Sequence, residues 1–191
     1  MFRPVRVTPS ADLPLPISVE DVKSALRVDG TDSDAEIERL IKAAVEHYEG
    51  WSGVLGIAIV EQTWRQEFGR FEDRMCLRVR PVTSIASVKY RNEAGQIATV
   101  AAENYTLKHD GGGVAYVRFD SGFTAPVDLY EDAPVSIEYV AGWAEGEVPA
   151  DIQTAIILFV QKHFDEAARD NWQHLDRVER DLTSKYRSLS V

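Results

Sequence analysis

The chain has 191 residues and a formal net charge of −10, from 21 Lys and Arg against 31 Asp and Glu. Hydrophobic residues make up 45% of the chain and charged residues 27%, as in ordinary globular proteins of one or two domains. The negative charge disfavours a protein that binds duplex DNA over its whole surface, because such a surface repels the phosphate backbone. The single cysteine, Cys76, excludes an internal disulfide. The longest apolar run is too short to span a bilayer and no signal peptide is visible, so we expect a cytoplasmic protein with no membrane partner.

The first 17 residues predict an extended arm, because they contain half of the chain's prolines: Pro4, Pro9, Pro14 and Pro16. Residues 18–56 predict the first helical part of the chain. Ser18 can cap a short helix that Gly30 ends. A second helix follows over residues 33–50, where Ser33 and Glu36 form a possible capping box ahead of apolar residues at helical spacing.

Residues 57–145 change to a period of two, which is typical of β-strands. Met75, Leu77 and Val79, for example, alternate with polar or charged residues. Two glycine-containing turns, at residues 92–95 and 111–113, separate pairs of such segments and predict hairpins. We therefore expect six or seven short strands in a mostly antiparallel region.

The C-terminal part returns to helical patterns. Residues 149–170 surround an apolar run at 156–160, which predicts the central helix of a bundle. Residues 171–191 carry a narrow apolar stripe on a charged background and predict an amphipathic segment able to dock on a partner. The expected fold is α+β: a small helical bundle from the N- and C-terminal helices, with the antiparallel β-region inserted between them.

The search for chemistry finds no constellation that indicates an enzyme. None of the four histidines has the spacing of a metal motif, and none lies beside Cys76 in the sequence. Cys76 also lacks a local basic motif that would mark it as a nucleophile. The acidic run at residues 29–34 resembles the start of a calcium loop, but it lacks the glycine at the sixth position of such a loop and the glutamate at its end. We therefore expect no catalytic residue, no metal site and no cofactor.

One charged feature is local, a cluster of arginines in the first strands of the β-region. They are interspersed with carboxylates, so an exposed strand face of mixed sign is one interpretation. The other is a patch that meets an acidic neighbour, a second copy of the chain, or DNA inside a channel. The members of the cluster are Arg65, Arg70, Arg74, Arg78 and Arg80.

Several segments, in the same order along the chain, resemble the head–tail connector (adaptor) proteins of tailed phages, prophages and gene transfer agents. The resemblance covers about residues 16–165. It rests on the opening at residues 16–29, the helix end at 48–53, the strand start Gln62-Thr63-Trp64, the run at 80–90, and the segments 140–143 and 148–156.

The resemblance implies a structural protein without enzymatic activity. Members form a homo-oligomeric ring, typically of twelve copies, between the portal protein and the stopper or tail protein of a phage-like particle. Double-stranded DNA passes through the ring as cargo, and the protein, made in the cytoplasm, ends at the head–tail junction. The C-terminal segment of the family commonly docks on the portal, which assigns this role to Trp172, Leu175, Leu182 and Tyr186. The same side chains could instead cover the chain's own helix at residues 156–160.

Two other functions remain open from the sequence. A monomeric β-rich module that binds a ligand or carbohydrate is motivated by Trp64, Trp143 and the many tyrosines, although alternating aromatic residues are usually core residues. A small hydrolase would need the fold to bring two titratable groups together with perturbed pKa values.

Overall fold

The computed structural model describes residues 2–187 and divides into two compact units. The β unit combines the residues up to Leu13 with Glu61–Gly142, and the helical unit combines Pro14–Val60 with the chain from Trp143 onward. The described residues form four α-helices and two antiparallel sheets, of five and three strands, so the predicted α+β class is confirmed.

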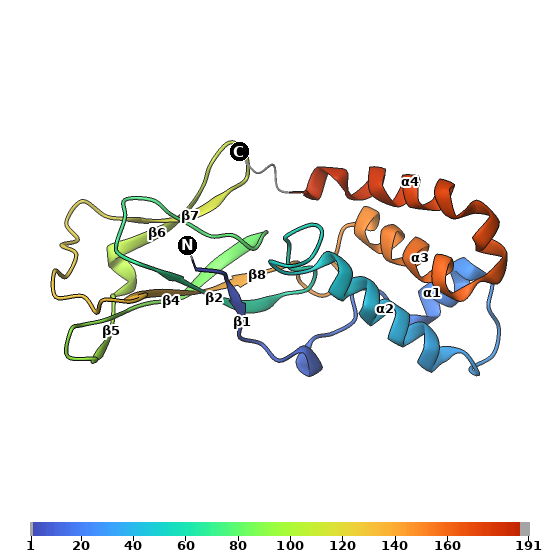
Figure 1. Ribbon diagram of the computed structural model, residues 1–191, viewed down its shortest axis with the longest axis horizontal. Coiled ribbons are helices and arrows are strands. Elements are labelled where there is room, and N and C mark those ends of the chain that lie inside the picture. Colours follow the sequence, from blue (N-terminus) through green and yellow to red (C-terminus); the bar gives the residue numbers. More distant parts are fainter. Residues whose placement is uncertain (1, 188–191) are drawn as a thin grey trace. The chain divides into compact units, whose positions relative to one another are not determined.

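The larger sheet of the β unit has the strand order β1-β2-β8-β4-β5 (Figure 1). Its central pairing joins β2 to β8 along seven residue pairs, from Gln62 opposite Ala141 to Phe68 opposite Val135. Strand β4 pairs with the other side of β8, with two irregularities in register. The strands are β1 (Val5–Arg6), β2 (Gln62–Phe68), β4 (Val82–Arg91), β5 (Ile97–Thr99) and β8 (Val135–Ala141).

The smaller sheet has the order β3-β7-β6, with β3 (Met75–Cys76), β6 (Tyr105–His109) and β7 (Ala115–Phe119). Polar side chains of the larger sheet reach the segment around β3. The side-chain amide of Gln66 donates to the carbonyl of Cys76 and accepts from the backbone N–H of Arg78, both at 3.0 Å. The buried Tyr139 hydroxyl accepts from the N–H of Val79 at 3.3 Å, and burial raises the pKa of this hydroxyl. These bonds satisfy polar groups that the apolar core would otherwise leave unpaired.

The N-terminal arm lies along the edge of the larger sheet. Strand β1 pairs with β2, and the N–H of Val7 donates to the carbonyl of Thr63 at 2.8 Å. The N–H of Thr63 in turn donates to the Thr8 hydroxyl at 2.9 Å. A short 3-10 turn, Ser10–Asp12, follows before the chain enters the helical unit. The extended conformation expected for a proline-rich arm is thus held by hydrogen bonds to the strand beside it.

The helical unit begins with α1 (Val19–Leu26), which starts as the sequence predicts. The N–H of Asp21 donates to the Ser18 hydroxyl at 3.0 Å. The capping box predicted for α2 (Asp34–Tyr48) is wrong, because Ser33 has φ −99° and ψ 0° and its side chain makes no cap hydrogen bond. A capping residue needs an extended backbone to aim its hydroxyl at the free N–H groups of the first turn.

The turn after α2 requires a glycine because its backbone passes close to the end of the helix. A Cβ on Gly53 would lie 2.1 Å from the carbonyl oxygen of Glu49, so no larger residue fits there. The Glu49 carboxylate is buried and accepts from the N–H of Ile59 at 2.8 Å, which fixes the chain as it leaves the turn.

Helix α3 (Ala150–Phe164) is in contact with each of the other three α-helices of the helical unit. It packs against α1, α2 and α4, and its residues Ile152, Ile156 and Val160 are fully buried (Figure 1). The 3-10 segment Glu166–Asn171 leads into α4 (Trp172–Thr183), and a last 3-10 turn covers Ser184–Tyr186. No helix in the described part of the chain is long and apolar enough to cross a membrane.

A buried polar cluster ties α4 to α2 and α3. The side chains of Lys162 on α3 and Glu179 on α4 are 5% and 8% exposed and form an ion pair. The Tyr48 hydroxyl, at the end of α2, donates to the same Glu179 carboxylate. Burial and this hydrogen bond to Glu179 raise the pKa of Tyr48, so the hydroxyl keeps its proton. Lys162 also lies 3.4 Å from Asp176. Three helices therefore meet at one buried polar site inside the core.

Replacing one partner of this cluster is expected to destabilise the helical unit strongly. In Lys162→Met the Glu179 carboxylate stays buried without its cation, which costs about 3–5 kcal/mol in free energy of unfolding. Urea denaturation followed by the helical circular dichroism signal measures this loss. The matched control is Lys42→Met, which removes an exposed pair with Glu38 and should change stability by less than about 1 kcal/mol.

The double variant Lys162→Met/Glu179→Leu leaves no buried charge and is expected to recover most of the loss. A double variant as unstable as the single one would show that the unpaired carboxylate is not the cause.

Candidate assembly surfaces

The five arginines singled out from the sequence belong to different elements of the β unit. Arg65 is on β2 opposite Val5 of the edge strand, whereas Arg74 immediately precedes β3 in the smaller sheet. Arg65 lies 3.9 Å from Glu67, and Arg70 lies 3.4 Å from Glu72, so carboxylates accompany these cations. Arg78 and Arg80 follow β3 and are half-buried. Strand β2 belongs to the five-stranded sheet and β3 to the three-stranded sheet, so closeness in sequence does not by itself place these arginines in one stripe.

Arg74 is the member of the cluster with the most defined surroundings. Its guanidinium forms an ion pair with Asp110 and lies 4.3 Å from the ring centroid of Tyr116. Asp110 also accepts from the N–H groups of Gly112, at 3.0 Å, and Val114, at 2.8 Å. These backbone bonds, the Val114 bond foremost, and the Arg74 contact lower the pKa of the Asp110 carboxyl. One carboxylate thereby holds the β6–β7 turn and orients an arginine.

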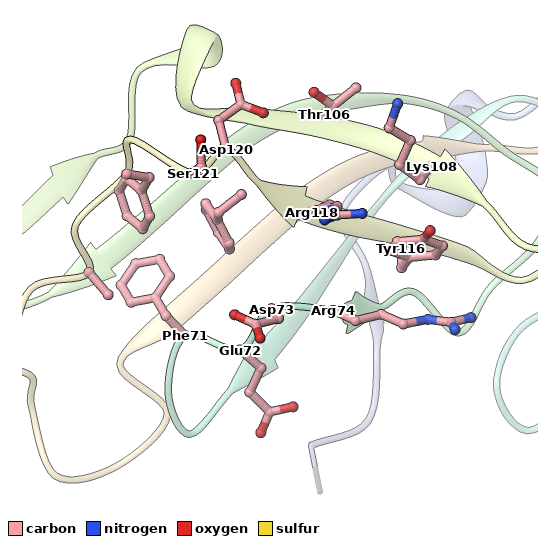
Figure 2. A pocket seen from close by; sticks show the side chains of 13 residues that line it. Phe71, Glu72, Asp73, Arg74, Thr106, Lys108, Tyr116, Arg118, Asp120 and Ser121 are labelled. Atoms are coloured by element: carbon pink, nitrogen blue, oxygen red, sulfur yellow. The ribbon is translucent and has the colours of Figure 1, made fainter.

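A hollow of about 880 Å³ opens beside this pair on the β unit (Figure 2). Cations and carboxylates both line it, and Figure 2 shows Arg118 and Lys108 projecting from β7 and β6 while Asp73 and Glu72 project from the segment before β3. Its lining contains no His or Cys, and the part of the chain that the structure describes holds no group of His, Cys, Asp and Glu able to bind a metal ion. The hollow is a mixed-charge surface with an aromatic wall.

The aromatic wall is a packed cluster. The rings of Phe119 and Phe123 stack at 4.7 Å between centroids, and Phe71 meets both edge-on at 5.3 and 5.4 Å. Such edge and stacked contacts stabilise a loop against a strand.

The tryptophans that motivated a ligand-binding module are in other surroundings. Trp64 is 5% exposed inside the β unit, and the half-buried Trp143 meets Tyr186 edge-on at 5.9 Å. Neither ring is an open platform on which a sugar could stack, so nothing in the structure favours that alternative.

The C-terminal residues assigned to docking lie on or after α4 and contact the chain's own helical unit in part. Trp172 meets His163 of α3 at 5.3 Å and lies under the Lys162 ammonium at 5.2 Å, yet remains 39% exposed. Leu175 and Leu182 are half-buried, as is Tyr186. The stripe therefore both covers α3 and leaves an aromatic edge at the surface.

The buried Lys162–Glu179 pair was missed by the sequence reasoning. Two signals were present: a lysine inside an otherwise apolar helix, and a glutamate at the stripe spacing between Leu175 and Leu182. Oppositely charged residues at core positions of two helices indicate that the two side chains form an ion pair with each other.

Comparison with protein families decides the relationship. The model of the head completion protein family matches residues 16–172. This chain belongs to the head completion protein family. A search of curated protein sequences found no significant match.

Solved structures similar to this chain come from gene transfer agent (GTA) particles. A chain in the neck of an empty GTA particle, computed with C6 symmetry, has a TM-score of 0.74 and 22% identity, covering 100% of this chain and 97% of that one. A chain of the native GTA virion gives 0.71 and 21%, covering 98% and 96%. A chain in the native neck computed with C12 symmetry gives 0.67 and 20%, covering 100% and 97%. This chain therefore shares the fold of these chains over nearly its whole length.

Removing the Asp110 carboxylate is expected to loosen the β6–β7 turn. In Asp110→Ala the N–H groups of Gly112 and Val114 lose their acceptor, so their hydrogen exchange should accelerate several-fold, as measured by NMR. The neighbouring Asp73→Ala, at the same hollow, should leave both amides unchanged. Unchanged hydrogen exchange in Asp110→Ala would contradict the role of this carboxylate in holding the turn.

The stability of the β6–β7 turn should also depend on pH, because it relies on the ionised Asp110 carboxylate. Because the folded pKa of Asp110 lies below its ordinary value, its stabilisation is present above that ordinary value and is lost as the pH falls through the lowered pKa. A pH titration of the two amide signals tests this sign.

Proposed function

We propose that this chain is a structural ring subunit, an adaptor that joins the portal of a phage-like particle to the stopper or tail protein and forms part of the DNA channel. The observation that carries the proposal is the family match over residues 16–172, together with the likeness of the entire chain to neck chains of GTA particles. The C6 and C12 symmetries of those neck structures support a ring of copies, and twelve is the number we propose.

The chemistry of the chain is consistent with this role. A subunit of a ring needs two different surfaces that fit each other, and it needs no reacting groups. We propose that the protein works without catalysing a reaction and that it assembles in the cytoplasm before it becomes part of the head–tail junction.

Double-stranded DNA enters this proposal as cargo. The chain carries ten more acidic than basic residues, and a ring multiplies that excess around its axis. A channel of net negative charge repels phosphates at short range, so DNA slides through it and does not adhere.

The portal is the partner that we assign to α4. Trp172 keeps an exposed edge on a helix whose other contacts hold it to α3, so it can insert into a portal groove while α4 stays folded. Aromatic anchors of this kind dominate the binding energy of many interfaces. Leu175, Leu182 and Tyr186 would complete the contact around it.

Trp172→Ala is expected to weaken binding to the purified portal protein by at least about tenfold, because it removes the anchor. Surface plasmon resonance with immobilised portal rings measures the change, and circular dichroism confirms folding. The matched control is Trp51→Ala, since Trp51 belongs to the same unit and is 38% exposed against 39% for Trp172. Equal effects of the two substitutions, or no effect of either, would contradict the assignment of α4 to the portal.

A further inference from the structure

Strand β6 is the longest edge strand in the described part of the β unit. It ends the three-stranded order β3-β7-β6 and is five residues long. The other edge strands, β1, β3 and β5, have two, two and three residues. Strand β6 contains no proline, and its pairing with β7 runs without a bulge. Proteins usually blunt or cover an edge of this length, because its free N–H and C=O groups can pair with another chain.

The ladder with β7 determines which backbone groups of β6 point outward. Directly after β6, the N–H of Asp110 donates to the carbonyl of Val114 at 3.1 Å. Bonded and non-bonded residue pairs alternate along an antiparallel ladder, so Lys108 and Thr106 also bond to β7, whereas the residues on either side of them do not. These other residues therefore direct their backbone N–H and C=O groups away from the sheet.

The residues with outward backbone groups are Tyr105, Leu107 and His109. The N–H of Tyr105 donates to the carbonyl of Ala102 in the preceding 3-10 turn, so only its C=O is open. Leu107 and His109 keep both groups open, since no backbone or side-chain group in the described part of the chain bonds to them. The His109 side chain, whose Nε2 lies 3.2 Å from the Val82 carbonyl, anchors the strand. The edge is therefore a fixed row of unpaired donors and acceptors.

We propose that two copies of the free chain pair antiparallel along β6. The inference goes beyond the proposed ring and does not depend on it. When Leu107 lies opposite Leu107 of the second copy, each N–H of this pair donates to the carbonyl of the other. The N–H of each His109 then donates to the open C=O of Tyr105 in the other copy. The smaller sheets of the two copies thereby join into one continuous sheet.

The side chains of β6 fit this self-pairing and its register. Thr106 and Lys108, which line the hollow on one face of the strand, lie opposite each other across the two copies (Figure 2). No charge therefore faces a like charge directly. A shift of two residues in one direction would bring the two Lys108 side chains face to face, and a shift in the other direction would leave His109 unpaired. The sequence of β6 thus favours one register with a second copy of itself.

The symmetry of this contact assigns it to protein outside a particle. The contact is isologous, so it closes after two copies and does not grow into a filament. In a ring each copy meets its two neighbours through two different surfaces, which is another kind of contact. Pairing along β6 therefore belongs to the free protein, in which it covers an edge that would otherwise promote aggregation.

A disulfide trap tests the pairing. Opposite residues of a non-bonded pair have Cα atoms about 4.5 Å apart, within reach of a disulfide. In a Cys76→Ser background, a protein with Thr106→Cys is mixed with a protein with Lys108→Cys under mild oxidation. The mixture is expected to give a disulfide-linked dimer on non-reducing gels.

Each cysteine protein alone is the matched control. Its two identical cysteines are offset by about 7 Å along the strands in addition to the spacing between strands, which is beyond disulfide reach. We therefore expect at least about tenfold less dimer than in the mixture, and circular dichroism confirms folding. No dimer from the mixture, or as much dimer from either protein alone, would overturn the proposal.

Hydrogen exchange of the unmodified protein provides the second test. A single short strand pair dissociates on dilution, so the amides of Leu107 and His109 should exchange several-fold more slowly in concentrated than in dilute samples, as measured by NMR. The amides of Thr106 and Lys108, which bond to β7, are internal controls and should exchange at one rate in both samples. Exchange at Leu107 and His109 that is independent of concentration would overturn the pairing and leave the ring proposal standing.

Discussion

The antiparallel pairing of β2 with β8 is the constraint on which both units depend. It begins with Gln62 opposite Ala141, beside two of the three points at which the chain passes between units, 60/61 and 142/143. The two ends of the inserted segment Glu61–Gly142 are therefore adjacent. On the other side of the boundary, Val60 and Trp143 form a bridge within the helical unit. Because of this closure, helices that are about one hundred residues apart in sequence can build one bundle.

Within that bundle, the position of α4 is determined by polar as well as apolar contacts. The narrow stripe of α4 buries little apolar surface, and the Glu179 carboxylate adds a partner that only one register of the helix can satisfy. A buried pair contributes less to stability than to specificity, since a displaced helix would leave both charges unpaired. Because the buried pair holds α4 in one position, it also determines which edge of Trp172 remains at the surface. The proposed portal contact therefore depends on this pair in the core of the helical unit.

Local patterns in the sequence predicted the elements that depend on neighbouring residues. The period of 3.6 identified the helices, the period of two identified the strands, and Ser18 was recognised as a cap. Interactions between distant residues were not predictable in this way. Tyr48 and Glu179 are 131 residues apart, and β1 becomes a strand only because β2 supplies its partner. The arginines were grouped by closeness in sequence, whereas the fold places Arg65 on the larger sheet and Arg74 beside a strand of the smaller one.

The central claim, that this chain is a ring subunit of a particle neck, is tested most directly by electron cryomicroscopy of the neck of particles that contain it. We expect a ring of density at the head–tail junction into which the β unit and the helical unit each fit, repeated once per copy. A neck map in which other proteins account for all of the density at that junction would contradict it.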